Sequence, residues 1–150
     1  MKVYNMVIVF SAILLGLLAL FRPLQKNNFY ILHCAIVILS AYYIEHNVFK
    51  VNPFDIRTFL LFLVFHFVSI NIVTILTYYV DKRAAQKGKW RVPETNMHSL
   101  ELLGGWIGGL VGQKVFHHKT KKKAYQGTFW FLGIMQLAII FLILKFLKMI

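Results

Sequence analysis

The fold of this protein is decided by residues 58–80, which read TFLLFLVFHFVSINIVTILTYYV and contain no charged side chain. A helix of 23 residues rises about 35 Å, which is enough to cross a hydrocarbon core of about 30 Å. Tyr78 and Tyr79 stand near the end of the stretch, where an interfacial aromatic belt is expected. The stretch therefore predicts a membrane-spanning helix from Thr58 to Val80.

Three further apolar stretches predict spans at Val3–Phe21, Asn28–Ile44 and Gly127–Phe146. We expect the first to be retained, because Arg22, Pro23 and more apolar sequence follow it instead of a small-residue cleavage site. Helices are the spanning form expected here, since no alternating strand pattern of a barrel is present. The predicted fold is all-α: one integral membrane domain, residues 1–150, with a bundle of about four transmembrane helices.

The composition supports this class. Hydrophobic residues make up 59% of the 150-residue chain, charged residues make up 15%, and the mean hydropathy is +0.65. Typical soluble domains are about half apolar and about a quarter charged, and disordered chains carry far fewer apolar side chains. Cys34 is the single cysteine, which excludes an intrachain disulfide and a multi-thiolate zinc site.

The formal net charge of +12 is concentrated in one part of the chain. Ten of the 17 Lys and Arg residues lie between residues 81 and 126, in two clusters. The clusters consist of Lys82, Arg83, Lys87, Lys89 and Arg91, and of Lys114, Lys119, Lys121, Lys122 and Lys123. By the positive-inside tendency we expect residues 81–126 to face the cytoplasm, with anionic lipids as partners.

Residues 100–116 are apolar but barely long enough to span, since 17 residues rise only about 25 Å. Crossing would also leave one basic cluster on the wrong side of the membrane. We therefore expect a glycine-rich re-entrant or interfacial helical element from about Pro93 to Phe116. At about 100° per residue, its small and ionisable residues share one face opposite bulky apolar ones. This pattern favours one continuous helix with Pro93 as its first residue.

Glycines on this element suggest a second kind of partner. Gly104, Gly108 and Gly112 stand four residues apart, a spacing that permits close helix contact in lipid. The alternative is that these glycines allow a turn in the chain and let backbone N–H groups approach a ligand. The spacing predicts a possible homo-oligomer, and with it the hypothesis of an assembly subunit.

The chain from Tyr79 to about Trp130 resembles a bacterial family of small membrane proteins catalogued as domain of unknown function 1294. The resemblance rests on the blocks 81–84 (DKRA), 91–94 (RVPE), His98 with 102–105 (LLGG), and 116–122 (FHHKTKK) with Tyr125. It implies a membrane protein of unassigned activity. The sequence departs from the family at Ile107, where proline is frequent, and at His117, where arginine is usual. A bidentate arginine role is therefore not carried over to His117.

The first functional hypothesis is that a basic cytoplasmic face binds anionic lipid head groups or another phosphorylated ligand. The cationic contacts would come from both clusters, with two carboxylates orienting them. The predicted residues are Lys82, Arg83, Arg91, His118, Lys119 and Lys122, oriented by Asp81 and Glu94. A nucleic-acid partner is not expected, since no aromatic-rich basic strand pattern is present.

The second hypothesis is a small enzyme that acts on a lipid-borne substrate. Glu94, His98 and Glu101 fall on one stripe of the predicted helix, and His118 could join them as an acid–base or metal-ligating group. Glu101 near membrane depth would be costly without a partner, for which Arg91 and His98 are the candidates. The sequence predicts no metal site and identifies no cofactor.

Two histidines fall within predicted spans. Counted from opposite membrane surfaces, His33 and His66 would lie about 10 Å apart along the membrane normal. A haem held between them is therefore not expected.

Overall fold

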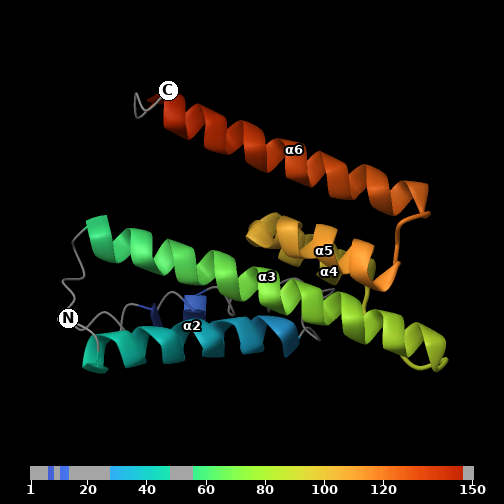
Figure 1. Ribbon diagram of the computed structural model, residues 1–150, viewed down its shortest axis with the longest axis horizontal. Helices are drawn as coiled ribbons and strands as arrows, with labels where there is room; N and C mark the ends of the chain where they lie inside the picture. The colour runs from blue at the N-terminus through green and yellow to red at the C-terminus, as the bar shows by residue number, and fades with distance from the viewer. Residues whose placement is uncertain (1–6, 9–10, 14–27, 48–55, 147–150) are drawn as a thin grey trace. The chain divides into compact units, whose positions relative to one another are not determined.

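The computed structural model describes residues 7–8, 11–13, 28–47 and 56–146 (Figure 1). These residues form helices and connecting segments, with no strand among them, which confirms the all-α prediction. The α-helices are α2 (Asn28–Asn47), α3 (Ile56–Gln86), α4 (Glu94–Leu100), α5 (Trp106–Phe116) and α6 (Lys123–Phe146), and a π-helical segment, η2 (Glu101–Gly105), joins α4 to α5. The predicted span Val3–Phe21 lies largely outside the described residues. Contacts divide the chain into two compact units, residues 1–73 and 74–150.

Three helical segments among the described residues are long and apolar enough to cross a membrane: Phe29–Asn47, Leu60–Gln86 and Lys123–Phe146. The predicted bounds were too short, because the helices continue beyond their apolar stretches. α3 extends six residues past Val80 through good helix formers. The outer faces are strongly apolar, as shown by Phe131 and Ile134, which are 65% and 64% exposed. Such continuous apolar surface supports membrane association.

In the first unit, the structure brings His33 and His66 into contact, whereas the expected separation along the membrane normal was about 10 Å. His33 Nε2 is 3.2 Å from His66 Nδ1, and His33 Nδ1 is 2.9 Å from the hydroxyl of Ser69. The prediction counted each histidine from a different membrane surface. Counted from the connection between α2 and α3, the two positions differ by only about four residues, or about 6 Å, which two imidazole side chains can bridge.

In the second unit, a left-handed glycine ends α3 and turns the chain back. Gly88 has a φ of 60°, and the amide of Lys89 donates to the carbonyl of Ala84 over 3.0 Å. This is the hydrogen-bond pattern of a Schellman C-cap, in which glycine adopts the left-handed conformation without a Cβ clash. α4 begins at Glu94, one residue later than predicted, because Pro93 is its N-cap.

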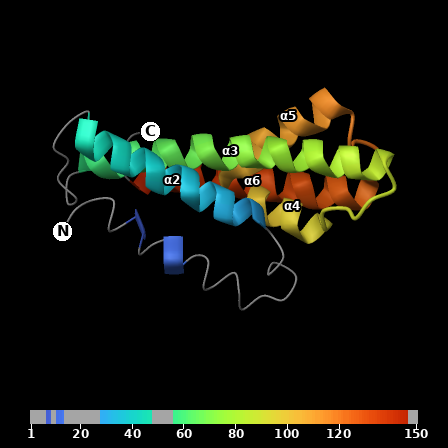
Figure 2. The ribbon, with the colours of Figure 1, turned by 90° about the horizontal axis from the view of Figure 1, so that it is seen from below.

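The prediction of one continuous helix from Pro93 to Phe116 is wrong. Gly104, inside η2, has a φ of 108°, so the helix is kinked there before α5 begins at Trp106. Figure 2 shows α4 and α5 as separate, divergent helices. A Cβ on Gly105 would lie 2.1 Å from Thr74 Oγ1, so this close approach to α3 requires glycine. Periodicity alone missed the break because small residues continue on the same face after it.

Side-chain capping and close packing hold the broken element in place. The Gln136 amide of α6 donates to the carbonyls of Glu101 and Leu102, over 2.6 and 3.0 Å. A Cβ on Gly112 would lie 2.8 Å from Cβ of Tyr78, and one on Gly109 would lie 3.0 Å from the ring of Phe129. Gly109 and Gly112 thus make close contacts within the chain.

Two glycines of α6 provide a matched test of this packing. A Cβ on Gly133 would lie 2.3 Å from the indole of Trp106, which stacks on Phe129 and donates to its carbonyl. We expect Gly133→Ala to lower the free energy of unfolding by about 1–3 kcal/mol, because the indole must shift. A Cβ on Gly127 would meet nothing within 4 Å, so Gly127→Ala should be neutral or stabilising by up to about 1 kcal/mol. Thermal unfolding in a nonionic detergent measures both, and equal effects would contradict the packing argument.

Candidate functional site

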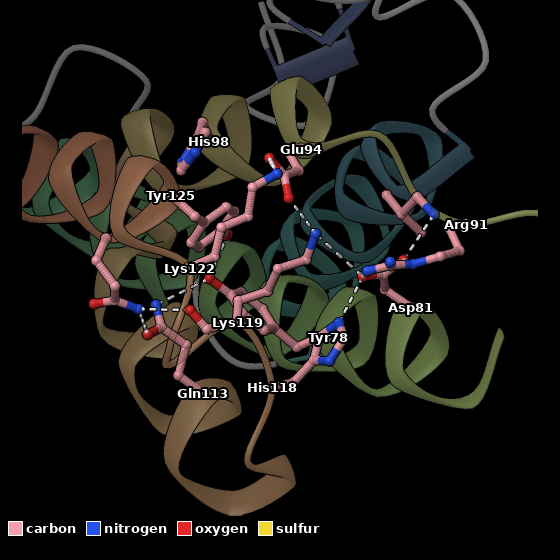
Figure 3. A network of polar contacts seen from close by, with 12 residues as sticks. Tyr78, Asp81, Arg91, Glu94, His98, Gln113, His118, Lys119, Lys122 and Tyr125 are labelled. Carbon is pink, nitrogen blue, oxygen red and sulfur yellow. Dashed lines mark hydrogen bonds and ion pairs between the residues drawn. The ribbon is translucent and has the colours of Figure 1, made fainter. Parts of the chain in front are cut away.

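Asp81, in the last turns of α3, is fully buried and collects partners from two distant segments (Figure 3). Its carboxylate accepts two hydrogen bonds from Arg91, at 3.0 and 3.3 Å, and one from the backbone amide of Val92, at 3.0 Å. His118 Nε2 donates over 2.6 Å, and Lys119 Nζ lies 3.8 Å away. Asp81 therefore joins the two basic clusters of the sequence at one carboxylate.

Backbone turns bring these partners to Asp81. The cap at Gly88 returns residues 91–92 to the end of α3. After α5, His117 and Lys119 adopt positive φ values of 47° and 64°, an uncommon conformation for residues other than glycine. These two turns direct the His118 and Lys119 side chains to the carboxylates of Asp81 and Glu94.

Glu94, at the start of α4, forms a second anchor. Its two oxygens accept hydrogen bonds from Lys119 at 2.5 Å and from Lys122 at 2.8 Å. Partial burial opposes ionisation of Glu94, but the two lysines outweigh it and hold its pKa below the usual value. The hydrogen bond to Asp81 raises the pKa of Arg91 in turn. Both groups are therefore charged at neutral pH.

These side chains line an open pocket of about 710 Å³. Its lining consists of Arg91, Glu94, His117, His118, Lys119, Thr120, Lys121 and Lys122. Lys119 is pinned, with a side chain only 7% exposed, whereas Lys122 is 56% exposed. We call the side chains that Asp81 and Glu94 anchor the pocket floor: Arg91, His118 and Lys119. We call the exposed side chains the pocket rim: His117, Lys121 and Lys122.

A second polar cluster surrounds the fully buried carboxylate of Glu101. Its Oε1 accepts from the hydroxyls of Tyr78 at 2.5 Å and Tyr125 at 2.8 Å, and those two hydroxyls lie 2.6 Å apart. His98 Nδ1 is 2.7 Å from Oε2, and its ring stacks on Tyr125 with centroids 4.2 Å apart. Gln113 donates to the Tyr78 hydroxyl over 3.2 Å. This cluster joins α3, α4, η2, α5 and α6.

Two side chains at the start of α6, Tyr125 and Gln126, connect the buried cluster to Lys119 of the pocket. Lys119 Nζ lies 5.3 Å from the centroid of the Tyr125 ring, a cation–π contact. The Gln126 amide donates to Oε1 of Gln113 at 2.5 Å and to the carbonyl of Lys119 at 2.9 Å. The buried cluster therefore contacts Lys119 of the pocket through Tyr125 and Gln126.

The structure brings together six of the eight predicted ligand-site residues. These are Asp81, Arg91, Glu94, His118, Lys119 and Lys122. Lys82 and Arg83 are not part of the pocket lining, and Arg83 lies over the Tyr79 ring at 5.2 Å.

The four acid–base candidates fall into two separate clusters. Glu94 and His118 belong to the pocket, whereas His98 and Glu101 pair in the buried cluster. His98 is the partner expected for Glu101, while Arg91, the other candidate, pairs with Asp81 instead. Within the described part of the chain, no three His, Cys, Asp or Glu side chains converge as metal ligands would.

Sequence reasoning missed several residues that build these clusters: Tyr78, Gln113, His117, Lys121, Tyr125 and Gln126. Tyr78 was read only as an interfacial aromatic residue. Its position three residues before Asp81 places both side chains on one face of α3. That spacing is a signal that a polar face continues into the helix.

Comparisons with known proteins locate the part of the chain that is shared. The family described as "Protein of unknown function (DUF1294)" matches residues 71–125. The Bacillus subtilis (strain 168) protein described as "Uncharacterized protein YsdA" is 33% identical over 61 residues, which cover 41% of this chain and 68% of that protein. No solved structure matches the chain. The matched region contains both carboxylate anchors, the whole pocket lining and the Glu101 cluster up to Tyr125.

Proposed function

Because the chain belongs to the DUF1294 family of proteins of unknown function, and because the shared region holds the basic pocket, we propose that the protein binds phosphate-bearing anions there. The ligands are anionic lipid head groups or another phosphorylated molecule. The observation that carries this proposal is the pocket lining, in which four Lys or Arg side chains face one carboxylate.

The cations of the pocket floor are preorganised. Asp81 holds Arg91 and His118, and Glu94 holds Lys119, so these side chains are ordered before a ligand arrives. Ordering a long side chain on binding costs about 0.5–1.5 kcal/mol, which a preorganised site avoids. Unanchored surface lysines would lack this advantage.

The charge distribution supports a cytoplasmic position for the pocket. Ten of the 17 Lys and Arg residues lie in residues 81–126, against three acidic residues there. The positive-inside tendency favours the cytoplasmic side for such a segment, in the bacterial inner membrane. The anionic head groups of that leaflet would then lie within reach of the rim.

The rim lysines give the sharpest test of binding. We expect Lys121→Gln with Lys122→Gln to weaken retention of anionic phospholipid by about tenfold or more, because each change removes a charged donor that lines the pocket, and a hydrogen bond to a charged group contributes about 1.5–3 kcal/mol. Native mass spectrometry of the protein in nonionic detergent, with anionic lipid added against phosphatidylcholine, measures the retention.

The control is Lys87→Gln with Lys89→Gln, which removes the same charge from exposed positions outside the pocket. This control should retain lipid like the unmodified protein. Retention should also fall as salt rises, through screening of the charges. Equal losses in both double variants, or retention independent of salt, would refute binding at the pocket.

A further inference from the structure

The charges around the pocket set the kind of anion that it can neutralise. Four cationic side chains surround it, and two carboxylates, Asp81 and Glu94, pair with three of them. With neutral histidines, these six side chains carry a formal charge of about +2. A phosphate monoester carries between −1.5 and −2 at pH 7, roughly, whereas a diester carries a single negative charge.

The hydrogen-bond donors point the same way. Lys122 is 56% exposed, and each lysine ammonium has three donors, of which Glu94 takes one. Lys121 and His117 are exposed on the same rim. A terminal phosphate offers three unesterified oxygens to these donors, whereas a diester offers two. The formal charge of about +2 around the pocket is larger than the single negative charge of a diester. The rim also offers more hydrogen-bond donors than the two unesterified oxygens of a diester match.

Resting on the proposed function, we infer that the pocket selects phosphomonoesters over phosphodiesters. The two oxygens of Glu94 accept one hydrogen bond each from Lys119 and Lys122, so the two ammonium groups lie close enough for one anionic group to contact both. The monoester binds at the exposed Lys122 ammonium and contacts Lys121 and His117 on the rim. It can come from a lipid head group such as phosphatidic acid or from a soluble phosphorylated molecule.

Two arms of one experiment test the selectivity and identify the source. The soluble arm titrates methyl phosphate and dimethyl phosphate into the full-length protein in phosphatidylcholine nanodiscs, followed by calorimetry at pH 7.5. The lipid arm supplies equimolar phosphatidic acid and phosphatidylglycerol in detergent and counts the retained lipids by native mass spectrometry. We expect at least a fivefold preference for the monoester. A preference in both arms assigns the recognition to the terminal phosphate alone, and one in the lipid arm alone assigns it to the membrane-borne head group.

A charge variant links the preference to the pocket. Lys122→Gln reduces the local formal charge by one and should cut the monoester preference to below twofold, while Lys87→Gln, outside the pocket, should leave it unchanged. Equal binding of monoester and diester, sensitive to salt and to the rim variants, would overturn the selectivity while leaving the proposed function standing. Binding of neither anion in either arm would overturn both.

Discussion

Replacement of Asp81 by alanine should lower the free energy of unfolding by about 3 kcal/mol, one of the two largest effects that we expect from a single side chain. The substitution leaves the buried amide of Val92 without an acceptor and removes the shared partner of Arg91 and His118. Loss of one member of a buried ionic group costs about 3–5 kcal/mol, and the 48% exposure of Arg91 places the estimate at the lower end. Chemical denaturation in a nonionic detergent measures the change.

Glu94→Ala is the matched control for Asp81→Ala. Glu94 also accepts hydrogen bonds from two cationic side chains, but its own side chain is 33% exposed. Its pairs are partly exposed, and exposed ion pairs contribute about 0–1 kcal/mol each, so this control, with two pairs, should lose about 1–2 kcal/mol, less than Asp81→Ala. Equal losses in the two variants would show that Asp81 is not the anchor of the two basic segments.

Glu101→Ala is the other large effect, and we expect a loss of about 2–3 kcal/mol. Its carboxylate accepts hydrogen bonds from the buried hydroxyls of Tyr78 and Tyr125 and pairs with His98. Removing it leaves at least one buried hydroxyl without an acceptor, at a cost of about 1–3 kcal/mol, and opens a cavity beside Gly109. The same denaturation measurement applies.

Two further variants separate this network from ordinary side-chain removal. Leu102→Ala truncates the next residue of η2, which is 49% exposed, and should cost less than about 1 kcal/mol. Tyr125→Phe removes one of the hydroxyl donors, and a double-mutant cycle with Glu101→Gln should give a coupling energy of at least about 0.5 kcal/mol. Additive effects in this cycle would contradict a hydrogen-bonded network, even if Glu101→Ala alone is destabilising.

The sequence predicted the apolar helices because their signal is local. A run without charged side chains, such as residues 58–80, indicates an apolar environment by its composition alone. Its length decides whether the helix can span a membrane. Its helical bounds were less accurate. The apolar run ends at Val80, whereas the helix continues through Asp81 to Gln86. The cap at Gly88 then ends it through a backbone geometry that hydropathy does not record.

The candidate site was predicted from its charges but not from its connections. The scarcity of acidic residues drew attention to Asp81, Glu94 and Glu101, and each of them proves to be a point where several donors converge. Of their partners, the sequence anticipated His98 for Glu101. The other pairings depend on the break at Gly104 and the turn at His117. The helical period places Glu94 on one stripe with His98 and Glu101, and the break at Gly104 lies beyond all three. Glu94 nevertheless pairs with Lys119 and Lys122, because the turn after α5 brings these lysines to the start of α4.

The hydrogen bond from the Val92 amide to Asp81 has a consequence for hydrogen exchange. Val92 lies in a connecting segment between α3 and α4, and it is 5% exposed. Amides in such segments usually exchange within the fastest class, since local opening costs almost nothing. This one can exchange only when the carboxylate anchor releases it, so its protection factor should resemble those of helix-interior amides. The exchange rate at this single amide therefore reports how often the segment at Arg91 and Val92 leaves Asp81.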